Sequence, residues 1–164
     1  MPTPKLQTSR ALKVIPSDTV PIPNPFPMAS GTATSYLMDE LDDNTKDFVA
    51  LGIRAGDVVY NTASNTSALV IFDPTSSAPS ELLLSADIFP LGSESYVIYQ
   101  NSPLSGDPNA GAVLYVGMGG DIEVVTAGGD TVVFSQVPTG AFVPVNVVQV
   151  KANGTSAQKI VALW

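Results

Sequence analysis

The sequence predicts an all-β protein, built as a sandwich, a jelly roll or a partial barrel, with one short helix and an extended proline-rich N-terminal arm. Short apolar runs rich in Val, Ile, Leu and Tyr recur roughly every ten residues after Gly56, a spacing typical of antiparallel β-domains. Gly, Pro, Asn and Ser separate these runs and predict turns. Half of the 14 prolines lie before Tyr36, where the arm is expected.

The N-terminal arm is expected to cover residues 1–35. Proline fixes φ, disfavours helix in the preceding residue and cannot donate a hydrogen bond to a sheet, so this stretch should be extended. It also contains apolar side chains that need a groove in which to be buried. These are Leu12, Val14, Ile15, Val20, Ile22 and Phe26. We expect them to bind a neighbouring subunit; a disordered tail is the alternative.

Residues 36–101 are expected to form a helix followed by a small β lobe. The helix is predicted over 36–52, because Leu37 and Leu41 are four residues apart and Gly52 suits the position after a helix end. Its five acids lack the ligand spacing of a calcium loop, so a solvated acidic helix face is favoured. These acids are Asp39, Glu40, Asp42, Asp43 and Asp47.

Strands are expected in both halves of the remaining chain. In the small lobe they are predicted at 57–61, 68–72, 82–84 and 96–99. Residues 102–111, with two prolines and two glycines, predict a linker. The C-terminal β domain, 112–164, should contain strands at 112–116, 122–125, 131–134, 144–150 and 159–164. Glycine-rich turns at 117–121 and 127–130 predict tight hairpins.

The charge composition indicates association with other proteins. Only 13% of the residues are charged, while 45% are hydrophobic, so apolar patches should remain on the surface and favour an oligomer or a lattice component. The net charge of −8 argues against nucleic-acid binding. Before Tyr36 there are three basic residues and one acid, so the arm is mildly basic and the rest strongly acidic.

The residue types predict a non-catalytic protein without a cofactor or a metal. Absence of cysteine and histidine excludes disulfides, thiolate or imidazole metal sites and a histidine base. Asp121 and Glu123 share a strand face, for which an ordinary solvent-facing role is favoured over a glycosidase pair. No apolar run approaches the roughly 20 residues of a membrane span, and no signal-peptide core is present, so no membrane association is expected.

Three segments resemble structural proteins of tailed-phage particles, especially phages of cyanobacteria. Residues 11–18 resemble the opening of small virion proteins, and residues 47–61 a segment common in them. Residues 113–134, followed by 142–145 and 154–164, are similar to the spike-base domain found on the heads of gene transfer agents and related phages.

This resemblance implies a structural role on the virion exterior. The expected function is head decoration (cement) or the base of a head spike, with assembly in the host cytoplasm. Expected partners are further copies of the chain, as a homotrimer, and the major capsid protein or another virion protein. A tail-fibre, baseplate or carbohydrate-recognising receptor-binding module is the alternative. The resemblance supplies no catalytic residues.

Overall fold

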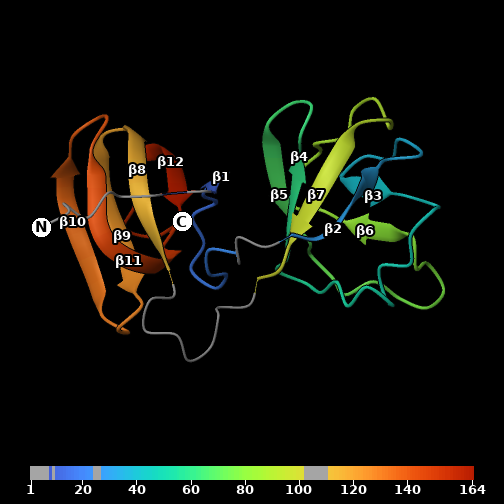
Figure 1. Cartoon of the computed structure of the whole chain (residues 1–164), viewed down its shortest axis with the longest axis horizontal. Coiled ribbons are helices and arrows are strands. Elements are labelled where there is room, and N and C mark those ends of the chain that lie inside the picture. Colours follow the sequence, from blue (N-terminus) through green and yellow to red (C-terminus); the bar gives the residue numbers. More distant parts are fainter. Residues whose placement is uncertain (1–7, 9, 24–26, 102–110) are drawn as a thin grey trace, which may run out of the picture. The chain divides into compact units, whose positions relative to one another are not determined.

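The computed structural model describes residues 8, 10–23, 27–101 and 111–164. Across these ranges the chain forms twelve β-strands in antiparallel sheets of six, four and two strands, and it contains no helix (Figure 1). The all-β prediction is confirmed. None of the described segments is a helix that could cross a membrane. The chain divides into unit 1, Met1–Pro25 with Ser102–Trp164, and unit 2, Phe26–Asn101.

Unit 1 contains the six-stranded sheet, in the order β1-β12-β8-β11-β9-β10. Its strands are β1 (Ala11–Lys13), β8 (Ala112–Met118), β9 (Gly120–Thr126), β10 (Thr131–Val137), β11 (Phe142–Val150) and β12 (Gln158–Leu163). The first half of β11 pairs with β8 and its second half with β9, with register shifts between. Such bulges bend a strand, so β11 turns the sheet around one apolar core to which β8, β9, β11 and β12 all contribute.

The connection between β8 and β9 differs from the prediction. A hairpin was expected over 117–121, but β11 lies between these two strands in the sheet. The chain instead turns a corner at Gly119, where a Cβ atom would come within 2.6 Å of the Val137 carbonyl. Only glycine allows this close approach. The second predicted hairpin, at 127–130, is confirmed by the antiparallel pairing of β9 with β10, and Gly129 supplies its positive φ of 92°.

The N-terminal segment is an integral part of unit 1. β1 pairs with β12 and forms one edge of the sheet, and the Val14 N–H then donates to the carbonyl of Ile160 at 2.9 Å. Farther along, the N–H groups of Ser17 and Ile22 donate to carbonyls in the second half of β11, at 2.9 and 2.8 Å. The segment therefore bridges the two halves of the bent sheet and covers its core.

The prediction of a separate arm over residues 1–35 is wrong in the part of it that the structure describes. Residues 11–13 belong to the sheet of unit 1, and residues 27–32 form a strand of unit 2. The prolines remove donors only at their own positions, and the N–H groups of the residues between them pair with β11. The predicted linker, apart from Gly111, lies outside the described residues.

Unit 2 contains the four-stranded and the two-stranded sheets. The larger sheet has the order β2-β7-β4-β5, and the smaller pairs β3 with β6. The strands are β2 (Pro27–Thr32), β3 (Glu40–Asp42), β4 (Val58–Asn61), β5 (Thr66–Leu69), β6 (Glu81–Leu83) and β7 (Ser95–Tyr99). The core is centred on Tyr96, whose ring packs edge-on against Phe48 and Phe89 with centroids 6.3 and 6.2 Å away.

The helix predicted over 36–52 is also wrong. Strand β3 occupies its centre, and turns occupy most of the remainder. Leu41 is fully buried in β3, whereas Leu37 is exposed, so the two leucines do not share the apolar face that their spacing suggested. Asp39 has a left-handed φ of 59°, which breaks any helix at that point. Tertiary pairing with β6 overrides the weak local helical signal.

Candidate interaction surface

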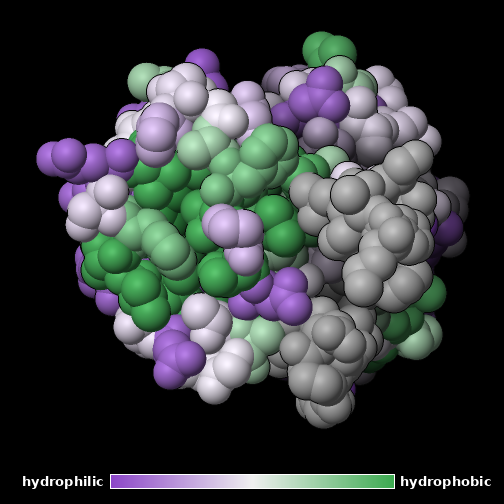
Figure 2. Space-filling model, turned by 60° about the vertical axis from the view of Figure 1, so that its left-hand side comes forward, coloured by the Kyte–Doolittle hydropathy of each residue, from purple (hydrophilic) through white to green (hydrophobic). Residues whose placement is uncertain are grey.

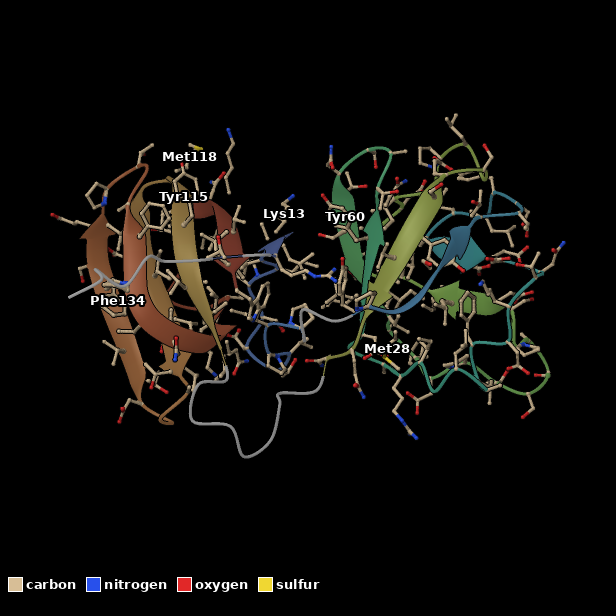
Figure 3. All side chains as sticks on the ribbon, in the orientation of Figure 1. Lys13, Met28, Tyr60, Tyr115, Met118 and Phe134 are labelled. Carbon is tan, nitrogen blue, oxygen red and sulfur yellow. The ribbon has the colours of Figure 1, made fainter. Side chains whose placement is uncertain are left out.

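The outward-facing side of the unit 1 sheet carries a row of apolar side chains. Directly paired residues of antiparallel strands share a face, and the register aligns Lys13, Val161, Tyr115 and Phe142 across β1, β12, β8 and β11. Figure 3 labels Lys13 on β1 and Tyr115 on β8. The intervening residues, such as Leu114, are buried and point into the core. The row therefore lies on the side of the sheet opposite to the core.

A second pair, Val113 with Leu163, extends this surface. We call the surface made by Val113, Tyr115, Phe142, Val161 and Leu163 the outer face. Phe142 is 53% exposed and the other four are half-buried. Figure 2 shows hydrophobic residues gathered on the face turned toward the viewer, with a few hydrophilic residues among them. Extended apolar areas of this kind mark sites where another molecule binds.

Two aromatic rings form the centre of the outer face. The ring centroids of Tyr115 and Phe142 are 5.4 Å apart, with their planes inclined at 58°. Such a pair presents a large and rigid apolar surface. The exposed Lys13 ends the row at the edge strand β1. An apolar centre with a charged residue at its rim is the usual arrangement of a protein-binding surface.

Unit 2 exposes apolar side chains in smaller groups. Leu37, Met38 and Leu91 lie on turns, and Ile71 and Phe72 follow the end of β5. These residues belong to no strand; of the exposed large apolar side chains that the structure describes in unit 2, only Leu83 lies on one, the three-residue β6. Unit 2 also contains ten acidic and two basic residues, whereas unit 1 contains five of each. The net charge of the chain thus belongs to unit 2, and unit 1 is the neutral unit with the apolar sheet surface.

The acidic residues of unit 2 hold loops in place. Asp43, expected on a solvated helix face, is only 1% exposed. Its carboxylate accepts hydrogen bonds from the Thr45 hydroxyl at 2.6 Å and the Tyr96 hydroxyl at 2.7 Å. Burial disfavours the charged form of Asp43, but these hydrogen bonds outweigh it and lower the pKa of the carboxyl. Burial, and then the bond to Asp43, raise the pKa of Tyr96.

Two further buried carboxylates accept hydrogen bonds from backbone N–H groups. Asp57 accepts from the N–H groups of Arg54 and Asn101, both at 2.8 Å, and burial raises its pKa despite these bonds. Glu94 accepts from two N–H groups of the loop before β7, both at 3.0 Å. Burial opposes the charge on Glu94, but these and neighbouring N–H donors lower its pKa. These carboxylates are loop anchors that the sequence interpretation missed.

Of the strand-face pair Asp121 and Glu123, Asp121 uses its carboxylate in the same way, whereas Glu123 is bonded through its backbone N–H. Asp121 accepts from the N–H of Gln136 at 2.7 Å and so stabilises the bulge of β10. The Glu123 N–H donates to the Thr155 hydroxyl at 3.0 Å. Within the described ranges, no group of three or more carboxylates is arranged to hold a metal ion.

The residues predicted to bind a partner through the arm lie on unit 1. Leu12 and Val14 are buried, 8% and 5% exposed, and Val14 belongs to the unit's own core. The half-buried members are Ile15, Val20 and Ile22. Ile22 packs against the same core. Phe26 lies outside the described residues. The pocket expected on another polypeptide is, for Val14 and Ile22, supplied by this chain.

Comparison of the chain with models of protein families, with curated proteins and with solved structures finds no match.

Proposed function

We propose that this chain is a structural protein of a virus particle, a head-decoration (cement) or spike-base protein that binds the shell through the outer face. The main support for the proposal is the row of apolar side chains that the outer face leaves accessible. The segments that resemble spike-base domains, 113–134, 142–145 and 154–164, contain all five of its residues. The resemblance and the apolar surface thus concern the same part of the chain.

The chemistry of the outer face defines the partner. Burying an exposed Phe side chain contributes about 1.5–3 kcal/mol, so covering Phe142 and its neighbours supplies a substantial part of a binding free energy. The cationic Lys13 at the rim favours a carboxylate on the opposing surface. The fitting partner is therefore a shell protein with an apolar patch bordered by an acid.

The test is binding of the full chain to shells assembled without it, compared between two substitutions. Phe142→Asp places a charge in the outer face and should weaken binding roughly ten- to a hundredfold, the equivalent of about 1.5–3 kcal/mol. Phe72→Asp is the matched control, because Phe72 is 65% exposed but belongs to unit 2. It should leave the affinity within about twofold of the original.

Equal binding by the original chain and the Phe142→Asp variant would contradict the proposal, provided that both have the same circular dichroism spectrum. Weakening by Phe72→Asp alone would move the interface to unit 2. Glycan binding that Phe142→Asp abolishes, without binding to shells, would instead favour the carbohydrate-recognising module, since sugars stack on exposed aromatic rings.

A further inference from the structure

Strand β10 is an unusually exposed edge of the unit 1 sheet. It is the outermost of the six strands and has seven residues, with neither a charge nor a proline. Val132 and Val133 are 40% and 50% exposed, although consecutive residues of a strand point to opposite faces. An exposed, uncharged edge strand is a template for pairing with another strand.

The other edges of the two larger sheets are shorter or interrupted. β1 has three residues and ends on Lys13. β5 has four, and its last residue, Leu69, exchanges hydrogen bonds of 2.9 Å with Ser85. β2 begins with Pro27 and contains Gly31. Charges, prolines and coverage are the usual protections of sheet edges. Of the strand edges that the structure describes, β10 has the longest stretch without such protection.

The backbone of β10 presents a row of donors and acceptors. The Thr126 N–H donates to the Asp130 carbonyl at 2.9 Å, so these two residues form a hydrogen-bonded pair of the β9–β10 ladder. Hydrogen-bonded pairs alternate along such a ladder, so Val132 also directs its backbone groups to β9. Thr131 and Val133 therefore direct theirs away from β9. An extended strand is the partner that satisfies such a row.

We propose that β10 pairs antiparallel with β10 of a second copy of this chain, across a two-fold axis at Val133. In this register Val133 faces its own counterpart, Val132 faces Phe134, and Thr131 faces Ser135. Over residues 131–135 each cross-strand pair is thus apolar with apolar or hydroxyl with hydroxyl, and this stretch contains no charge. The strand is complementary to itself, as a two-fold interface requires.

The charge of unit 1 also permits a second copy as the partner. Unit 1 has equal numbers of acids and bases, so two copies meet there without net repulsion between these units. Association through unit 2 would oppose two groups of ten acids. The bulge at residues 135–136, where Gln136 has a φ of 53°, limits the paired stretch. The short interface predicts a weak, concentration-dependent dimer.

Sedimentation of the full chain over a range of concentrations tests this inference. A monomer–dimer equilibrium is expected, and Val133→Lys should raise its dissociation constant at least tenfold, because two ammonium groups would face each other across the axis. The substitution leaves the ladder to β9 intact, since backbone groups form it. Val49→Lys is the matched control: Val49 is 40% exposed and belongs to unit 2, outside the six-stranded sheet. It should change the constant less than twofold.

A thiol introduced at Val133 reports the register directly. The chain has no cysteine, so Val133→Cys creates a single thiol, which a short bifunctional thiol reagent should link into a covalent dimer. Val49→Cys should remain monomeric under the same treatment. A monomer at all concentrations, a mass of three copies, or equal linking of both variants would overturn the inference. Phe142→Asp leaves this edge unaltered, so the shell-binding proposal and the dimer proposal fail separately.

Discussion

At the scale of single residues, unit 2 depends on a few buried carboxylates. Asp43 links the turn after β3 to the core aromatic Tyr96 on β7, 53 positions later in the chain. A buried charge is tolerated only when hydrogen bonds replace its lost hydration, and Thr45 and Tyr96 supply them. The spacing of Asp43 and Thr45 is typical of an Asx-type turn and is a local signal that identifies this site. The partner Tyr96 has no local signal.

Asp43→Asn should destabilise unit 2 by about 1–3 kcal/mol, because one amide oxygen cannot replace two carboxylate oxygens as an acceptor for these donors. The free energy of unfolding can be measured by urea titration, monitored by a signal that reports the burial of Tyr96. Asp39→Asn is the control: Asn suits the left-handed φ of Asp39, and the cost should stay below about 0.5 kcal/mol.

The same variant should change how the free energy of unfolding depends on pH in the acidic range. The folded pKa of Asp43 is lowered from its ordinary value of 3.8, so its contribution is present above that value and is lost as the pH falls through the lower folded pKa. Asp43→Asn should therefore flatten the loss of stability below about pH 4. An acid limb identical to that of the original chain would show that Asp43 is not linked to folding.

At the scale of elements, local pattern predicts the strands of the C-terminal part and fails for the N-terminal ones. The runs 112–116, 122–125 and 131–134 contain β-branched residues, and each lies within an observed strand; burial alternates along the first two. β1 has three residues and pairs with β12, at the other end of the chain. No local pattern encodes such a pairing. The nearby prolines suggested a free arm because they make the backbone stiff and extended. They do not indicate that a strand of the same chain, β12, is available for pairing.

The integral position of the N-terminal segment makes it a stability element. Val14→Ala should lower the stability of unit 1 by about 2 kcal/mol, since it removes buried methyl groups from the core. Ile15→Ala, at a half-buried neighbour outside that core, should cost less. Denaturant unfolding of the full chain compares them. Equal and small effects of both substitutions would indicate that this segment does not pack on unit 1.

At the scale of the whole molecule, the chain combines a neutral unit and an acidic one. The composition predicted a surface with apolar patches, and the exposed Phe142 and Val133 agree with it. The sequence did not reveal where these patches lie, because the register of β8 with β11 and β12 decides which residues share a face. That register depends on pairings between residues such as Tyr115 and Phe142, which are far apart in the chain.

The most direct measurement is hydroxyl-radical footprinting of the full chain, free and bound to shells, with mass spectrometry of the oxidised side chains. Oxidation of Tyr115 and Phe142 should fall on binding, because the partner covers the outer face. Oxidation of the control Phe72, which is 65% exposed, should stay the same. Unchanged oxidation of Phe142 in chains that are demonstrably bound, or protection of Phe72 alone, would contradict binding through the outer face.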